Sequence, residues 1–202
     1  MRKSMARGFA RLATAVVVAG LGLVAAVSGA SVASAAAPAL VFNINGGWTD
    51  NGTAKPSIIQ SGSSVVVNMS YANRPTAFGN VVDATTIVVR FPDAGTITGT
   101  LQGTGTIRWN NGSSWQKVFS GALVHDVNGT WTDGASTQSI SNIGGYLRVV
   151  FQNGRPTGVG FARNSTTIQV TFPDNATYLA TVDPSGFLFW SNNTVWTHPI
   201  LH

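Results

Sequence analysis

The sequence predicts an all-β protein made of two tandem copies of a repeat of about 80 residues. Several short sequence blocks of the first copy recur in the same order in the second. Within each copy, apolar and polar residues alternate with a period of two, which is typical of half-buried strands. Groups of turn-forming residues recur about every 8–12 residues. Together these observations predict short antiparallel meander strands that form two small barrels or one fused sandwich.

The leader, residues 1–35, is expected to form a secretory signal peptide. Four basic residues precede an apolar run over 12–30, and the small residues Ala33-Ser34-Ala35 follow it. The alternative is an uncleaved membrane anchor, because such a run is nearly long enough to cross a bilayer. Cleavage after Ala35 would leave a secreted, extracellular chain that begins at Ala36. The Ala-rich leader and the absence of cysteine favour a bacterial source.

The net charge of +5 comes from 12 basic and 7 acidic residues, and on its own it suggests a nucleic-acid or anionic-membrane partner. Four of the basic residues lie in the leader, which leaves eight against seven acids and a net charge of +1. The remaining basic residues are scattered singly, and we therefore expect no nucleic-acid partner. Membrane contact is expected only through an uncleaved leader. A secreted chain without cysteine has no disulfides and must be stabilised by apolar burial.

The two copies are predicted to span residues 41–118 and 124–200, joined by residues 119–123. The spacing between matching blocks shortens by two between Asp133 and Arg155, which places a net deletion there. The matching blocks are Asn45–Asp50 with Asn128–Asp133, Arg74–Thr76 with Arg155–Thr157, Phe91–Asp93 with Phe172–Asp174, Trp109–Asn111 with Trp190–Asn192, and Trp115 with Trp196. Each copy is near the size at which one core alone is marginal.

The apolar positions of each copy define the inner faces of its predicted strands. The sets expected to share a face are Val65, Val67, Met69 and Tyr71; Leu147, Val149 and Phe151; Ile87, Val89 and Phe91; and Ile168, Val170 and Phe172. We expect six to eight strands of about five to seven residues in each copy. Strands of this length are too short for an outer-membrane barrel, in which about 9–11 residues per strand are needed.

All six tryptophans belong to the repeat pattern. A five-residue loop between Trp109 and Trp115 would make them a directly opposed cross-strand pair, and Trp190 and Trp196 would match them. One interpretation is that the rings fill the cores. The other is that some rings lie exposed in a groove, where the apolar face of a sugar would stack on them. In that case the hydrogen bonds would come from neighbouring polar side chains, which are Asn110, Asn111, Gln116, Asn192 and Asn193.

Arg74 and Arg155 each precede a proline, and each copy also has an aspartate in a Phe-Pro-Asp turn, Asp93 or Asp174. Two hypotheses follow. The arginines form ion pairs with these aspartates, or their planar guanidinium groups bind an anionic partner. Asp50 and Asp133 are expected to form turns.

No metal or cofactor is expected. The segment Asp126–Gly129 could contribute to a calcium site, but Asn43–Gly46 in the other copy lacks the carboxylate.

The sequence does not indicate an enzyme. It contains no glutamate and no cysteine, and two of its three histidines lie in the last five positions. There is no Gly-x-Ser-x-Gly motif to present a nucleophilic serine. The repeated acids are turn aspartates, whereas a glycosidase needs two facing carboxylates. Two equivalent copies instead suit a module that binds weakly at each site and gains avidity from linkage.

Two resemblances to known families lie in the ends of the repeat. The Gly-x-Trp of Gly46–Trp48 and Gly129–Trp131 resembles the start of the calycins, the lipocalins and avidins. The resemblance implies that these tryptophans close one end of a barrel. The pattern from Trp-Thr-Asp to Ile107-Arg108-Trp109-Asn110-Asn111 and Trp115 is similar to a widespread, largely uncharacterised family of secreted β-repeats. That family implies a fold rather than an activity.

We therefore expect a secreted, non-catalytic binding module whose partner is an extracellular glycan or small ligand. Carbohydrate is the expected ligand class. The candidate ligand-binding residues are Trp109, Asn111, Trp115, Trp190, Asn192, Trp196, Arg74 and Arg155. Two alternatives stay open. One is a calycin-like carrier or inhibitor that binds a small apolar ligand or a protein. The other is a structural surface protein with all its tryptophans in the core.

Overall fold

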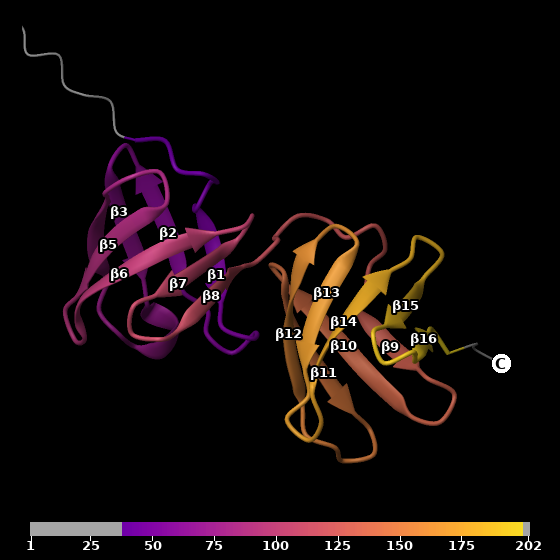
Figure 1. The fold of residues 1–202 in the computed structure, drawn as a ribbon. Helices are drawn as coiled ribbons and strands as arrows, with labels where there is room; N and C mark the ends of the chain where they lie inside the picture. Colours follow the sequence, from indigo (N-terminus) through magenta and orange to yellow (C-terminus); the bar gives the residue numbers. More distant parts are fainter. Residues whose placement is uncertain (1–37, 200–202) are drawn as a thin grey trace, which may run out of the picture. The chain divides into compact units, whose positions relative to one another are not determined.

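The computed structural model describes residues 38–199, so the predicted leader lies outside the described residues. This part of the chain contains sixteen β-strands and one short 3₁₀ helix, and no α-helix. The strands form two closed antiparallel barrels of eight strands each, one after the other along the chain (Figure 1). The predicted all-β fold of two tandem repeats is confirmed, and the structure selects two barrels over a fused sandwich. Between residues 38 and 199 no helix is long and apolar enough to cross a membrane.

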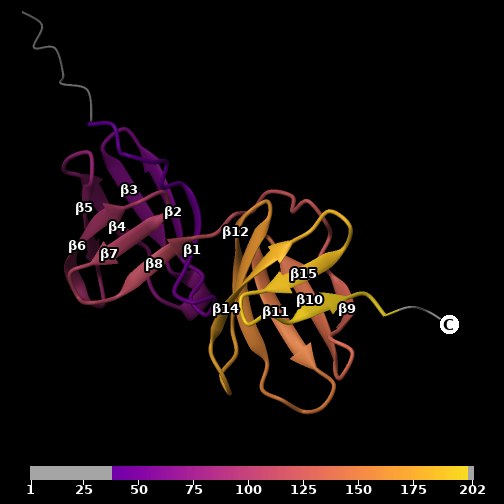
Figure 2. The ribbon, with the colours of Figure 1, turned by 45° about the vertical axis from the view of Figure 1, so that its right-hand side comes forward.

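The first barrel is an up-and-down meander in which each strand pairs with the next (Figure 2). Strand β8 returns to pair with β1, with Trp48 opposite Lys117, and this pairing closes the barrel. The 3₁₀ helix η1, Ser70–Ala72, lies between β3 and β4. The strands are β1 Gly46–Thr49, β2 Ser57–Ser61, β3 Ser64–Asn68, β4 Ala77–Val81, β5 Thr86–Phe91, β6 Gly95–Gln102, β7 Thr106–Trp109 and β8 Ser114–Lys117.

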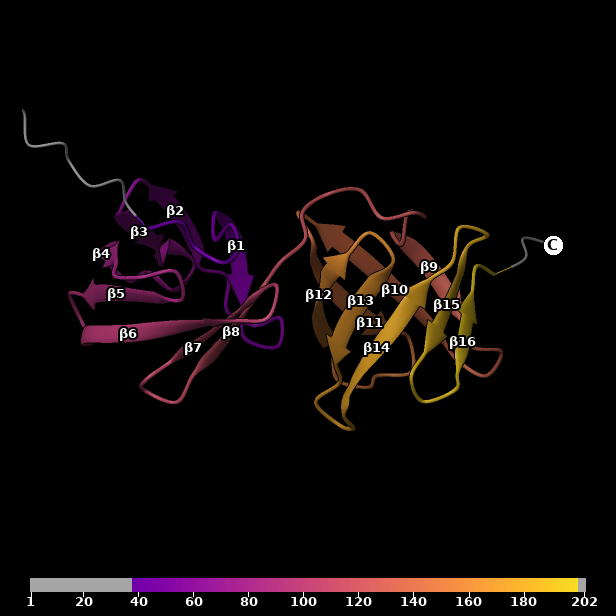
Figure 3. The same ribbon diagram turned by 45° about the horizontal axis from the view of Figure 1, so that its top comes forward.

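The second barrel repeats this meander, and it closes by pairing of β16 with β9, where Thr197 lies opposite Thr132 (Figure 3). The strands are β9 Gly129–Thr132, β10 Thr137–Ile143, β11 Tyr146–Phe151, β12 Gly158–Asn164, β13 Thr167–Thr171, β14 Thr177–Val182, β15 Phe187–Trp190 and β16 Val195–Thr197. Its strand order therefore matches that of the first barrel.

Each barrel has its own core, formed by the inward-facing residues of the alternating pattern. The predicted inner faces of β5, β11 and β13 are buried as expected. Val65, Val67 and Met69 are buried as well, but Tyr71 is exposed, so its predicted place on the same face is wrong. The alternation stops there because β3 ends at Asn68 and the chain turns through η1.

Gly79 in β4 and Gly160 in β12 occupy matching positions that require glycine. A Cβ atom on Gly79 would lie 2.2 Å from the carbonyl oxygen of Val88 in the neighbouring strand. A Cβ atom on Gly160 would lie 2.1 Å from the carbonyl oxygen of Gln169. A side chain at either position would push two paired strands apart, so glycine allows the close approach in both barrels.

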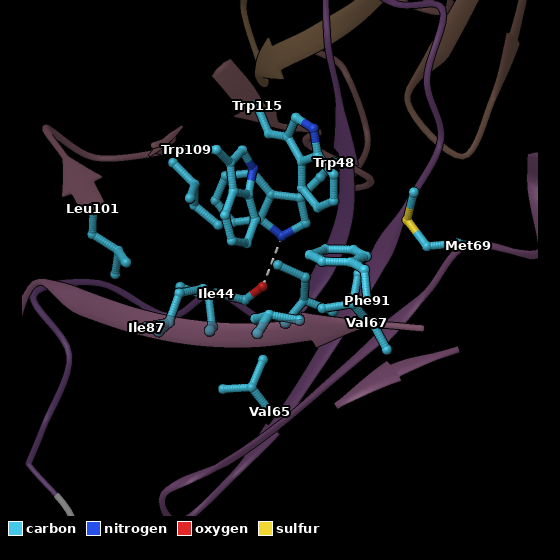
Figure 4. Packing of buried hydrophobic residues seen from close by; sticks show 14 of the residues in the cluster. Ile44, Trp48, Val65, Val67, Met69, Ile87, Phe91, Leu101, Trp109 and Trp115 are labelled. Atoms are coloured by element: carbon cyan, nitrogen blue, oxygen red, sulfur yellow. Dashed lines mark hydrogen bonds between the residues drawn. The ribbon is translucent and has the colours of Figure 1, made fainter. Parts of the chain in front are cut away.

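One end of each barrel is closed by a buried tryptophan and by the segment that precedes the first strand. The indole Nε1 of Trp48 donates to the carbonyl oxygen of Ile44 at 2.9 Å (Figure 4). Trp131 makes the matching bond to Val127 at 2.8 Å. Both indole rings are fully buried. Because this end is filled, a ligand of either barrel must use the opposite end or the outer surface.

Candidate functional site

The other end of the first barrel is hollow. In an eight-stranded meander, the four turns β1–β2, β3–β4, β5–β6 and β7–β8 all lie at the same end, and each contributes to this hollow. We call the hollow, of about 300 Å³, the first mouth. Its lining residues are Asp50, Ala54, Met69, Tyr71, Arg74, Phe91, Ala94, Ile97, Trp109, Asn111, Ser113 and Trp115.

The corresponding end of the second barrel has a smaller hollow, of about 100 Å³, which we call the second mouth. It is lined by Asp133, Phe151, Arg155, Phe172, Asn175, Tyr178, Trp190, Asn192, Thr194 and Trp196. The structure thus distributes the eight candidate residues over two matching places. Trp109, Asn111, Trp115 and Arg74 line the first mouth, and Trp190, Asn192, Trp196 and Arg155 line the second.

The four tryptophans of the two mouths belong to the barrel cores. Trp115 has the largest exposed fraction, 8%, and Trp109, Trp190 and Trp196 are exposed by 3–5%. Figure 4 shows Trp109 and Trp115 among the buried side chains of the first barrel, and the ring of Phe91 packs edge-on against Trp109. None of these rings offers an open face on the surface. A sugar in the first mouth would therefore meet parts of several apolar side chains at the wall of a hollow, and not a flat indole platform.

The predicted direct pairing of Trp109 with Trp115 is wrong. The amide of Trp109 donates to the carbonyl oxygen of Ser113, and Trp115 lies opposite Ile107. The turn between the strands contains only three residues, because Gly112 adopts a φ of 90° and the pairing resumes at Ser113. Trp115 lies two residues beyond Ser113, so both indole rings point inward and meet diagonally. The second barrel has the same arrangement, with Trp196 opposite Leu188.

The indole pairs pack closely and leave one donor unbonded. The ring centroids of Trp109 and Trp115 are 4.9 Å apart in an edge-to-face arrangement, and those of Trp190 and Trp196 are 4.7 Å apart. Within residues 38–199, the buried Nε1 atoms of Trp109 and Trp190 have no hydrogen-bond partner. Because the same donor is unbonded in both barrels, we attribute it to the shared packing of the repeat and not to a ligand of one mouth.

Each mouth has an arginine–aspartate ion pair at its rim. The guanidinium of Arg74 donates to both carboxylate oxygens of Asp93, at 2.7 and 3.0 Å. Arg155 binds Asp174 in the same way, at 2.9 and 3.2 Å. The hydrogen bond from each arginine lowers the pKa of its aspartate and raises the pKa of the arginine itself. The structure thus shows the predicted ion pair, and an anionic ligand would have to compete with this carboxylate.

Two polar groups of the first mouth are held in place by their own turns. The Oδ1 atom of Asp50 accepts bonds from the hydroxyl of Thr53 at 2.8 Å and the amide of Ala54 at 2.9 Å. The Oδ1 atom of Asn111 accepts from the amide and the hydroxyl of Ser113. These bonds orient the second carboxylate oxygen of Asp50 and the Nδ2 group of Asn111 without using them. The rim therefore carries an oriented acceptor and an oriented donor.

The two mouths differ because three lining positions carry larger side chains in the second barrel. Met69, Ala94 and Ile97 of the first mouth correspond to Phe151, Asn175 and Tyr178. The hydroxyl of Tyr178 donates to Asn175 at 3.0 Å, and the ring of Phe151 packs against Trp196. These contacts fill the second mouth. Its 100 Å³ lies below the range of small-molecule sites, about 300–1,000 Å³, whereas the first mouth reaches the lower limit of that range.

Sequence reasoning missed the lining residues that decide this difference. The sequence indicates Asp50 only as a turn residue and Tyr71 only as a strand residue. The substitutions from Met69 to Phe151 and from Ile97 to Tyr178 are visible when the copies are aligned, but their effect depends on knowing that they line one hollow. Partial desolvation of the Tyr71 side chain at the rim raises the pKa of its hydroxyl. Tyr71 therefore remains an uncharged donor at the rim.

Other parts of the described chain do not involve the eight candidate residues. A larger hollow of about 510 Å³ lies beside the β6–β7 turn and the linker, but none of the eight candidate residues lines it. Its lining is mainly glycine, amide and hydroxyl groups without a tryptophan. Among residues 38–199 no cluster of three or more His, Cys, Asp or Glu side chains is arranged to hold a metal ion. In particular, Asp126 accepts hydrogen bonds from Asn128 of its own turn.

Comparisons of the chain with protein-family models, with curated proteins and with solved structures give no match.

Proposed function

We propose that this protein is a secreted, non-catalytic binding module that holds one sugar residue of an extracellular glycan in the first mouth. The observation that carries the proposal is that matching ends of two similar barrels differ: the first stays open at about 300 Å³, and the second is filled. A packed fold alone does not need such an opening, because the second barrel closes with side chains at the same positions.

The chemistry of the first mouth favours a ring with both apolar and hydroxyl surfaces. Tyr71, which is 43% exposed, and the partly buried Ile97 offer apolar surface to the C–H groups of a sugar ring, whereas Met69 and Phe91 are exposed by only 1% and 4%. Asp50 offers a carboxylate oxygen that accepts hydrogen bonds from sugar hydroxyls, and such charge-assisted bonds are strong. Asn111 adds an amide donor. The ion pair at the rim occupies Arg74, so a neutral sugar is favoured over an acidic one.

Export and the absence of catalysis are supported by the sequence. The leader has the three regions of a signal peptide. The lining of the first mouth contains the carboxylate of Asp50. Asp93 adjoins the mouth because it binds the lining residue Arg74. The Asp93 carboxylate is bound to an arginine, so this mouth has no pair of free carboxylates for glycoside hydrolysis.

The test compares the wild type with a variant that fills the first mouth. Ala94→Asn with Ile97→Tyr introduces the residues that the second barrel has at these positions, so the fold is expected to tolerate them. Thr100→Tyr is the matched control, since Thr100 is exposed on the same strand. A glycan array would identify a ligand, and calorimetric titration with the corresponding soluble sugar would give the affinity.

We expect the filled variant to bind at least about tenfold more weakly and the control to bind like the wild type. Wild-type protein that binds no glycan, or a filled variant that binds as tightly as the wild type, would contradict the proposal.

A structural role is the second candidate, and one observation favours it. All six tryptophans are buried, as expected of a protein that uses them only for its cores. The calycin-like carrier is left with little room, because the inward-facing side chains of residues 38–199 form a packed core in each barrel. A hydrophobic dye whose fluorescence rises on binding, and falls again in the filled variant, would favour an apolar ligand over a sugar.

A further inference from the structure

The outer surface of the second barrel carries four exposed apolar side chains on three neighbouring strands, β14, β15 and β16 (Figure 3). They are Leu179, Phe187, Phe189 and Val195, with exposed fractions of 39–45%. We call this set the outer patch. Phe189 lies directly opposite Val195. The rings of Phe187 and Phe189 are nearly parallel, with an interplanar angle of 26° and centroids 6.1 Å apart. The patch is thus a continuous apolar surface built around two aligned rings.

The matching positions of the first barrel are polar. Leu179, Phe187, Phe189 and Val195 correspond to Thr98, Thr106, Arg108 and Ser114, which occupy the same places in the first copy. The barrel is therefore stable with polar side chains at these four positions, and neither strand pairing nor core packing requires the apolar ones. Exposed apolar side chains that the fold does not need indicate a contact surface.

The strands that carry the outer patch contain no charged side chain, and two charged residues lie at its edges. Strands β13 to β16 contain no Lys, Arg, Asp or Glu. Thr181 pairs with Phe189, Thr197 with Phe187, and Gln169 with Leu179. The amide of Asp183, in the β14–β15 turn, donates to the carbonyl oxygen of Phe187, and Arg163 donates to the side chain of Gln169. The corresponding face of the first barrel carries Arg90 and Arg108. Because one acid and one base leave the second face without net charge, an uncharged partner rich in hydroxyl groups matches it.

The size of the patch argues against a second copy of the chain as the occupant. Four side chains that are each about two-fifths exposed offer roughly 300 Å² of apolar surface. A stable protein–protein interface buries about 800 Å² on each partner. A polysaccharide chain lying along the strands needs less area, because its rings would pack on Phe187 and Phe189 while its hydroxyls bond to the flanking threonines.

From these observations we propose that the outer patch binds an uncharged polysaccharide, at a site separate from the first mouth. This proposal shares only the class of ligand with the function proposed for the first mouth. It does not depend on that function. The two sites bind different parts of a glycan. The first mouth binds a single sugar residue, and the outer patch binds the apolar face of an extended chain.

The test is depletion of the protein from solution by insoluble neutral polysaccharides, namely cellulose, chitin, a β-1,3-glucan and a mannan. Phe187→Thr with Phe189→Arg gives the second barrel the residues that the first barrel already carries. Phe78→Thr is the matched control, because Phe78 is 62% exposed on the outer surface of the first barrel. Far-UV circular dichroism and thermal unfolding verify that each variant is folded.

We expect at least one polymer to retain the wild type, and the patch variant to bind at least about tenfold more weakly. The Phe78→Thr control and the filled-mouth variant are expected to retain binding, and the patch variant is expected to bind soluble sugar unchanged. These measurements distinguish a loss of binding at the first mouth from a loss of binding at the outer patch.

Three results would overturn the proposal. The first is wild-type protein retained by none of the polymers. The second is a patch variant that binds as well as the wild type. The third is a wild-type dimer in size-exclusion chromatography that the patch substitutions convert to a monomer, which would show that a second copy covers the patch.

Discussion

The two mouths have the same frame and different contents. Each is formed by the same four turns, each contains two diagonal indole rings, and each has a bidentate arginine–aspartate pair at its rim. In the second, Phe151 and Tyr178 occupy the space that Met69 and Ile97 leave open. The comparison separates the residues that the barrel needs, which are the same in both copies, from the residues that differ and can serve a ligand. The repeated tryptophans belong to the first group.

The closed ends give the strongest test of what the two barrels share. Trp48→Ala and Trp131→Ala each remove a fully buried indole and its bond to a backbone carbonyl. We expect each substitution to lower the free energy of unfolding of its own barrel by about 3–5 kcal/mol. Urea denaturation followed by circular dichroism measures this. A loss of less than about 1 kcal/mol in either barrel would show that the two ends are not equivalent.

The reverse exchange at the mouths tests what the barrels do not share. Phe151→Met with Tyr178→Ile should open the second mouth and lower its stability by about 1–3 kcal/mol, because packing against Trp196 and the bond to Asn175 are lost. Calorimetry should then detect a second, weaker site for the sugar that binds the first mouth. If the opened mouth binds nothing although the fold is retained, volume alone does not distinguish the mouths.

The ion pairs at the two rims are expected to differ slightly in strength. The guanidinium of Arg155 lies 4.3 Å from the centroid of the Phe151 ring, whereas that of Arg74 lies 5.8 Å from Phe91. Both pairs are about one-third exposed, so each contributes little. Arg155→Ala should therefore lower the melting temperature more than Arg74→Ala, by a few degrees at most. The opposite order in thermal unfolding would show that the ring contact adds nothing.

The smallest expected effect is a dependence of stability on acid. Hydrogen bonds from the arginines lower the pKa of Asp93 and Asp174 in the folded protein. Their stabilising effect is thus complete above the pKa of about 3.9 that aspartate has in the unfolded chain. It is lost as the pH falls through the lowered folded values. Asp93→Asn with Asp174→Asn should reduce the change in melting temperature between about pH 5 and pH 2. An unchanged slope would assign the acid sensitivity to other aspartates.

Much of the fold followed from local patterns. Alternation in β5, β11 and β13 correctly identified the inner faces, because a strand buries every second residue wherever it is paired. The alternation failed at Tyr71, where an asparagine in the left-handed conformation, Asn73, ends the short helix after β3. The predicted pairing of Trp109 with Trp115 failed although the alternation held, because the loop length depends on where pairing resumes after Gly112. Both errors lie in turns, where a few dihedral angles override the pattern.

The sequence by itself determined the repeat and the strand periodicity, and it offered the arginine–aspartate pairs as one of two hypotheses. Each of these follows from residues near each other in the chain or from comparison of the copies. Only the tertiary structure decided that the tryptophans are buried, that one mouth is open while the other is filled, and that the four side chains of the outer patch lie together. Those properties depend on which side chains from four separate turns, or from three neighbouring strands, meet after the barrel closes.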